Sequence, residues 1–96
     1  MNIKHLEPNK VIDSIEVEIK EIGESREFNT FKGSGRVASA VVKDETGEVK
    51  LTLWNEQIDQ VKVGDKIKIE NGWAKQYRGE LQISTGIYGR LNVLEK

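Results

Sequence analysis

The stretch Val49-Lys50-Leu51-Thr52-Leu53-Trp54 decides how this chain folds, because aliphatic residues alternate in it with residues of other kinds without a break. Successive side chains of a β-strand point to opposite faces of a sheet. If the three aliphatic residues face a core, then Lys50, Thr52 and Trp54 stand on the solvated face. The pattern therefore predicts a half-buried strand that shows a large aromatic ring to water.

The segment Ile69-Glu70-Asn71-Gly72-Trp73-Ala74-Lys75-Gln76-Tyr77-Arg78-Gly79 carries a second aromatic pattern. By the same period of two, Trp73, Lys75 and Tyr77 share one face, and a lysine between two aromatic residues makes burial of that face costly. The isoleucines at the start of this strand have the same parity, yet they must belong to the core. We therefore predict a β-bulge at Asn71-Gly72, which moves the three later residues to the outside.

The rest of the chain reads as further strands joined by turns, with one short helix. Strands are predicted at 15–22 with a resumption at 26–28, at 36–43, at 49–54, at 66–77, and in a last segment with Leu81, Ile83 and Ile87 facing inward. The stretch 29–35 reads as a flexible loop, and Asp44-Glu45-Thr46-Gly47 as a tight hairpin turn. The only predicted helix covers 55–60, with Asn55 as its N-cap and with Ile58 and Val61 pointing inward.

This order of elements predicts the fold class. Three strands, a short helix and two more strands are the order of an OB-fold, so we expect an all-β protein with a five-stranded antiparallel barrel and one short helix between strands three and four. Residues 1–96 are expected to form one domain, with a lead-in over 1–10 and a C-terminal tail over 88–96.

Composition excludes several classes of protein. The 96 residues contain no cysteine and one histidine, so neither a disulfide framework nor a thiolate metal site can form, and no cofactor is expected. Asp44 and Glu45 are better explained as turn residues than as metal ligands, because no third ligand has suitable spacing. No apolar run approaches membrane-spanning length, and the N-terminus does not resemble a signal peptide. We expect an intracellular protein that is cytoplasmic and associated with the nucleoid.

The charge is unevenly distributed along the chain, although the net charge is only -1. Residues 1–27 carry a balance of -3, and residues 62–96, which contain most of the aromatic pattern, carry +3. A one-sided binding surface for nucleic acid requires such a separation. The modest local charge favours binding led by base stacking rather than by phosphate contacts.

The chain resembles a known family in six segments that occur in the same order and spacing. They are Arg36-Val37-Ala38-Ser39, Asp44-Glu45-Thr46-Gly47, Leu51-Thr52-Leu53-Trp54, Val63-Gly64-Asp65, Ile69-Glu70-Asn71-Gly72-Trp73 and Arg78-Gly79-Glu80-Leu81. The family is that of the OB domains of archaeal single-stranded DNA-binding proteins and archaeal replication protein A. The resemblance implies that Trp54, Trp73 and Tyr77 stack on bases. Family members often carry further tails or OB domains, so it also allows this chain to be one domain of a longer protein.

Several cations and further aromatic residues are candidates for the same surface. Those predicted to contact phosphate are Lys75, Arg78, Arg36, Lys50 and Lys32, with Lys43 and Arg90 as weaker candidates. Phe28 is expected in the core, whereas Phe31 is placed to close over a bound strand. Tyr88 is as consistent with packing on the barrel as with touching a base.

We predict a protein that binds single-stranded DNA with little sequence preference, acts in DNA replication, repair or recombination, and performs no chemistry. Its expected partners are single-stranded DNA and, beyond that, other OB domains or replication and repair proteins. No association with a membrane is expected. Two alternatives remain open at this point. One is an OB module that binds RNA, because stacking does not depend on the sugar, and the other is a protein-interaction OB domain of a replication protein A-like complex.

Overall fold

The structure, a computed structural model, describes residues 2–85 and 89–95. The elements in chain order are the 3-10 helix η1 (Ile3–His5), the strands β1 (Lys10–Ile22), β2 (Arg26–Thr30), β3 (Gly33–Asp44) and β4 (Gly47–Trp54), the helix α1 (Glu56–Gln60), and the strands β5 (Lys66–Tyr77), β6 (Glu80–Ser84) and β7 (Arg90–Glu95).

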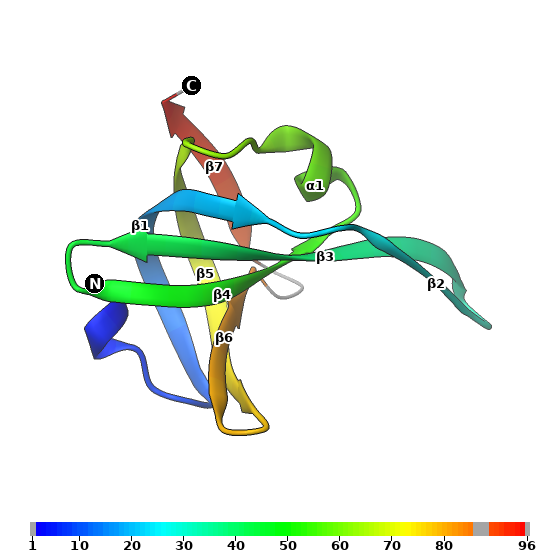
Figure 1. Cartoon of the computed structure of the whole chain (residues 1–96). Coiled ribbons are helices and arrows are strands. Elements are labelled where there is room, and N and C mark those ends of the chain that lie inside the picture. Colours follow the sequence, from blue (N-terminus) through cyan, green and yellow to red (C-terminus); the bar gives the residue numbers. More distant parts are fainter. Residues whose placement is uncertain (1, 86–88, 96) are drawn as a thin grey trace.

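Five of the strands close into a barrel (Figure 1). β1 pairs with β3, β3 with β4, β4 with β6, β6 with β5, and β5 pairs back to β1. The predicted five-stranded barrel with one short helix is therefore confirmed. The expectation that it is antiparallel throughout needs one correction, because β4 and β6 run parallel. The helix and β5 lie between these two strands in sequence. β5 runs back to the end of the barrel where β4 began, so β6 starts there and runs in the same direction as β4.

The barrel interior holds aliphatic side chains from every strand of the ring. The residues exposed by no more than 1% are Ile12, Ile15, Ile19, Ala40, Val42, Leu51, Leu53, Ile67, Ile69, Ala74 and Ile83. Val49, Leu51 and Leu53 are all buried, whereas Lys50 and Trp54 are exposed, as the alternation in 49–54 predicts. Leu81 is half-buried and packs against this core.

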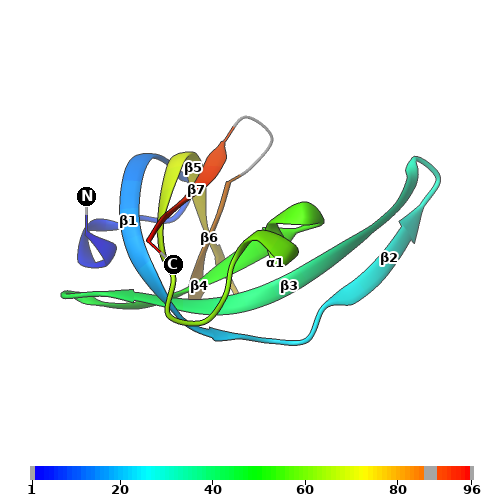
Figure 2. The same cartoon turned by 90° about the horizontal axis from the view of Figure 1, so that it is seen from above.

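The predicted loop over 29–35 is wrong, because most of this stretch is strand. β2 pairs with the first part of β3 from Arg26↔Val37 to Thr30↔Gly33, so the two strands form a hairpin with Phe31 and Lys32 at its tip. Figure 2 shows this hairpin as an arm that projects away from the barrel. None of the described residues 26–37 is buried, so the arm lacks the apolar alternation by which strands are recognised.

The expected C-terminal tail over 88–96 contains a strand. β7 pairs with the first part of β5, from Glu70↔Arg90 to Lys66↔Glu95, with an irregular register at the Lys66 end. Ile87 is predicted on the inner face, and Tyr88 is predicted to pack on the barrel or to touch a base. Both lie outside the described residues.

The face switch predicted in β5 occurs at the expected place, but the β-bulge predicted at Asn71-Gly72 is wrong, because the pairing of β5 with β1 shows no register shift there. Ile69 and Ala74 are buried while Trp73 is exposed, and Asn71 adopts a positive φ of 52°. The register with β1 nevertheless stays constant from Lys10↔Ala74 to Glu18↔Lys66. β1 switches faces at the same level, because its buried residues change from even to odd numbers between Ile12 and Ile15. This change also explains why the start of β1 at Lys10 is missed by a pattern that begins at Ile15.

Gly72 is required at this switch. A Cβ atom there would lie 2.9 Å from Cγ2 of Ile69 and 2.9 Å from the backbone oxygen of Ser84. Both contacts are closer than real Cβ atoms show, and one of them is backbone that cannot rotate away.

The predicted helix is present over Glu56–Gln60, with Ile58 half-buried and Val61 buried beyond its end. Asn55 occupies the N-cap position, as predicted, but its side chain makes no capping hydrogen bond. Instead, Oδ1 of Asn55 accepts a hydrogen bond from the backbone N–H of Arg36 at 2.9 Å, which ties the helix start to β3. None of the helices in the described part of the chain is long and apolar enough to cross a membrane.

Candidate nucleic-acid interface

One outer side of the barrel gathers the predicted stacking residues. We call it the aromatic face and define it as the outward side chains of β4 and of the second half of β5, namely Lys50, Thr52, Trp54, Trp73, Lys75 and Tyr77, with the outward residues of β6 between them. Strand pairing sets their order, because Thr52 lies opposite Ser84, and Ser84 lies opposite Trp73. In the next row, Gln82 separates Lys50 from Lys75.

The three predicted stacking rings are accessible to solvent. The exposed fractions are 39% for Trp54, 40% for Trp73 and 55% for Tyr77. Large aromatic residues contribute most to a core when they are fully buried. The partial exposure of three of them on one face therefore indicates a contact surface. The structure thus brings these rings to one side of the barrel, as their parity predicts.

Phe28 of the arm has an environment that the sequence did not reveal. Phe28 is half-buried but absent from the core, where it was expected. Its ring meets Trp54 edge to face, with centroids 5.9 Å apart and planes at 86°, and it covers Gly35, where a Cβ atom would come within 2.6 Å of the ring. Phe28 therefore extends the aromatic face toward the arm. Recognition of 26–35 as a hairpin would have excluded Phe28 from the core, since a two-stranded ribbon has no interior.

The tip of the arm is fully open. The Phe31 side chain is 96% exposed, and Nζ of Lys32 lies 5.9 Å from its ring centroid. This is close to the limit of a cation–π contact, which stabilises little when both groups are solvated.

Val11 is a further residue of this side that was not predicted. It lies directly opposite Trp73 in the β1–β5 pairing and is 58% exposed. Its side chain lengthens the apolar surface beside the Trp73 ring. The signal was present in the change of parity between Ile12 and Ile15, which places Val11 on the outside.

The predicted phosphate-binding cations fall into two groups. Among the described residues, Lys75, Arg78 and Lys32 make no ion pair with an acidic side chain. Arg78 sits in the turn before β6 with a positive φ of 52°, and its guanidinium carbon lies 5.3 Å from the centroid of the Tyr77 ring. These three cations remain open to a ligand.

Arg36 and Lys50 are engaged within the protein. Nη2 of Arg36 lies 2.7 Å from Oδ2 of Asp59 on α1, and the hydrogen bond and charge of Asp59 raise the pKa of the guanidinium. The same contacts lower the pKa of the Asp59 carboxyl. Nζ of Lys50 lies 2.9 Å from Oε1 of Glu80. Both pairs are exposed, so a phosphate can compete for either cation.

Asp44 shapes the turn before β4, as expected. Its Oδ1 accepts hydrogen bonds from the backbone N–H and the hydroxyl of Thr46 and from the N–H of Gly47, and its Oδ2 accepts one from the N–H of Ile3. Burial raises the pKa of this carboxyl, but the hydrogen bonds together bring it below the ordinary value. Within residues 2–85 and 89–95 no cluster of three or more metal-binding side chains occurs.

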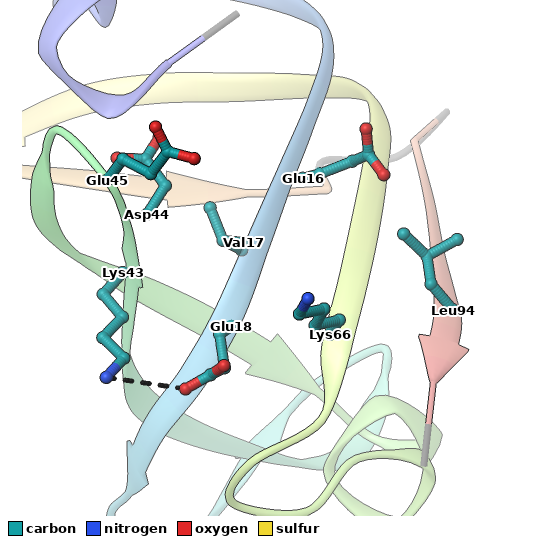
Figure 3. A pocket seen from close by; sticks show the side chains of 8 residues that line it. All are labelled: Glu16, Val17, Glu18, Lys43, Asp44, Glu45, Lys66 and Leu94. Carbon is teal, nitrogen blue, oxygen red and sulfur yellow. Dashed lines mark ion pairs between the residues drawn. The ribbon is translucent and has the colours of Figure 1, made fainter.

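One hollow of the described surface, about 510 Å³ in volume, is drawn in Figure 3, and none of its lining residues belongs to the aromatic face. Residues of β1, the end of β3, the following turn, the start of β5 and β7 line it, and Glu18 in its wall pairs with Lys43 at 3.5 Å. Four of its lining residues are acidic against two lysines, so the hollow offers an anionic strand no net positive charge. The aromatic face is the better candidate for contact with nucleic acid.

Comparison with known proteins agrees with this geometry. The chain is 37% identical over 84 residues to the single-stranded DNA binding protein Ssb of Saccharolobus solfataricus, a match that covers 88% of the chain and 57% of that protein. It is 27% identical over 95 residues to replication factor A of Methanothermobacter thermautotrophicus, covering 86% of the chain and 12% of that protein. The chain thus spans little more than half of the first relative and a small part of the second.

Solved structures agree as well. The second OB-fold domain of replication protein A from Methanococcus maripaludis superimposes with a TM-score of 0.81 and 34% identity, over 100% of this chain and 95% of that domain. The family model described as single-stranded DNA binding protein Ssb-like, OB fold, matches residues 4–93. The chain therefore belongs to the OB-fold family of Ssb-like single-stranded DNA-binding proteins.

Proposed function

We propose that this chain binds single-stranded DNA on the aromatic face. The observation that carries the proposal is the presence of Trp54, Trp73 and Tyr77, all partly exposed, on one side of the barrel of a chain from this family. Bases of any identity stack on such rings, and each stack contributes about 1–3 kcal/mol. Little sequence preference follows, because every base has an aromatic face.

The cations of this face play a smaller part. Lys75 stands between Trp73 and Tyr77 and meets the sugar-phosphate backbone of a strand whose bases lie on those rings. Arg78, stacked on Tyr77, is placed to meet the same backbone at the turn between β5 and β6. Three stacks, less the cost of ordering a flexible strand, correspond to micromolar to submicromolar affinity for one domain.

The proposal extends to the process and to the absence of chemistry. The chain would protect or present single strands during DNA replication, repair or recombination, without altering them covalently, inside the cell. The names of the relatives support this, since one is a single-stranded DNA binding protein and the other a replication factor A. Other OB domains and replication or repair proteins are the proposed protein partners.

A fluorescence titration tests the proposal directly. Stacking changes the environment of both tryptophans, so oligo-dT should quench their emission in a saturable manner. A matched oligo-rU competitor separates DNA from RNA preference. Absence of quenching, together with no binding by an independent method such as calorimetry, would exclude nucleic-acid binding and leave the protein-interaction alternative.

A further inference from the structure

A carboxylate stands at the turn end of the aromatic face, which is an unusual place for one on a surface that meets phosphates. Glu80 is the first residue of β6 and lies directly opposite Tyr77. It has the same parity as Gln82 and Ser84, so it projects outward beside the rings. Its Oε1 contacts Nζ of Lys50 at 2.9 Å, and the two side chains are about half exposed.

The ion pair occupies one of the two lysines that flank β6. Gln82 lies between Lys50 on one neighbouring strand and Lys75 on the other. A backbone whose bases stack on Trp73 and Tyr77 runs along β5 and passes this row. With Glu80 in place, Lys75 is open to its phosphates, while Lys50 is already neutralised.

Glu80 contributes little to holding the fold. The turn before it is fixed by the positive φ values of Arg78 (52°) and Gly79 (79°), and β6 is held by Leu81 and Ile83, which face the core. Ion pairs between half-exposed side chains stabilise proteins weakly, because water and salt screen them. The position of the carboxylate is therefore better explained by its effect on a ligand.

We propose that Glu80 is a built-in competitor of the DNA phosphates for Lys50, and that it keeps the affinity for single strands below what the aromatic face would otherwise reach. This inference rests on the proposed function. A strand gains the Lys50 contact only by displacing Glu80, and after displacement the carboxylate still repels the nearby phosphate. Each strand consequently dissociates faster than from a face without the carboxylate.

The substitution Glu80→Gln tests the inference, because it removes the charge and keeps the shape. With a short oligo-dT at about 50 mM salt, we expect this variant to bind about threefold more tightly or better than the unchanged chain, since one more phosphate is neutralised. The slope of log K against log salt should become steeper by about 0.7, the value for one contact on a single strand. The advantage should therefore shrink about 2.6-fold as salt rises from about 50 mM to about 200 mM.

The matched control is Glu18→Gln. It removes the same charge and also breaks an exposed ion pair, that with Lys43 at 3.5 Å, but it lies in the wall of the hollow away from the aromatic face. Its affinity and salt slope should equal those of the unchanged chain. A second control is Glu80→Gln combined with Lys50→Gln, which should not gain the steeper slope, because the freed cation is then absent.

The outcomes separate the two levels of the argument. If the unchanged chain does not bind oligo-dT, the proposed function is wrong and the role of Glu80 falls with it. If the unchanged chain binds and Glu80→Gln binds equally or more weakly with the same slope, only the role of Glu80 is overturned. An equal gain in Glu18→Gln would also overturn it, because the effect would then come from net charge alone.

Discussion

The two halves of β5 present different outward side chains on the same barrel. In the first half, Lys66 and Lys68 lie opposite Glu18 and Glu16 of β1, so positive and negative side chains alternate across strands. In the second half, Trp73, Lys75 and Tyr77 lie opposite Val11 of β1 and the polar residues of β6. The first surface pairs opposite charges across the strands, whereas the second leaves the rings and Lys75 without an acidic residue opposite Lys75.

The comparison explains how a chain with a net charge of -1 can present a surface for nucleic acid. Cross-strand pairs of opposite charge cancel locally, so Glu16 and Glu18 of β1 produce little field at the aromatic face. The net charge of the whole chain is therefore a poor guide to the local potential. What matters is which charges share a face.

Removing the rings of the aromatic face should abolish most of the difference between the two surfaces. The double substitution Trp54→Ala and Trp73→Ala should weaken oligo-dT binding by about 2–6 kcal/mol, from about 1–3 kcal/mol for each stack. The fold should survive, because both rings are partly exposed, and Trp54→Ala alone should behave in the same way at half the cost. Calorimetric titration measures the affinity and circular dichroism the folding. Unfolding of the single variant would show that the Trp54 ring serves the core instead.

A second test acts on the switch that separates the two halves. Gly72→Ala should lower the free energy of unfolding by about 1–3 kcal/mol, because the added methyl group meets Ile69 and the backbone of Ser84 at 2.9 Å. Gly47→Ala is the matched control, since a Cβ atom there meets only Ile3 at an ordinary distance of 3.7 Å. Urea denaturation compares the two. Equal stability of the two variants would contradict the close packing at the switch.

The salt dependence of binding sharpens the comparison without any substitution. If about two to four phosphates are neutralised, log K should fall against log salt with a slope of roughly -1.5 to -3. The engagement of Arg36 and Lys50 in ion pairs favours the shallow end of this range. Fluorescence titrations at several salt concentrations give the slope. A value much steeper than -3 would mean that cations rather than rings dominate the affinity.

The smallest effect is expected on the surface where opposite charges pair across the strands. Glu18→Gln should change the free energy of unfolding by no more than about 0.5 kcal/mol, because its pair with Lys43 is exposed. Thermal or urea unfolding measures it at low and high salt. A loss well above 1 kcal/mol would show that these cross-strand pairs hold the barrel together and do more than neutralise charge.

The sequence was sufficient for the barrel, because the order of the elements is that of an OB-fold, and for the exposed rings, because they depend on local parity. Alternation in 49–54 and the forced switch near Gly72 place Trp54, Trp73 and Tyr77 outside without knowledge of neighbouring strands. The arm was missed because its glycines and polar residues cover no core. Phe28 was consequently assigned to the interior, although it packs on Trp54.

The ion pairs could not be predicted for a different reason. Lys50 meets Glu80, and Arg36 meets Asp59, only because strand order and register bring distant segments together. Many acidic partners are possible for each cation in sequence, and only pairing selects one. Which cations are free for a phosphate is therefore a property of the fold, whereas which rings are exposed is already visible in the strand pattern.

The simultaneous change of face in β1 and β5 has a consequence for how this family can vary. Because the register of the two strands is the same above and below the switch, neither strand carries an unmatched residue. An insertion or deletion at 13–14 alone would turn Ile12 outward or slip its pairing with Gly72. One at 70–71 alone would turn Trp73 inward or slip its pairing with Val11. The two segments, nearly 60 positions apart in the chain, are thus expected to change length together in evolution or not at all.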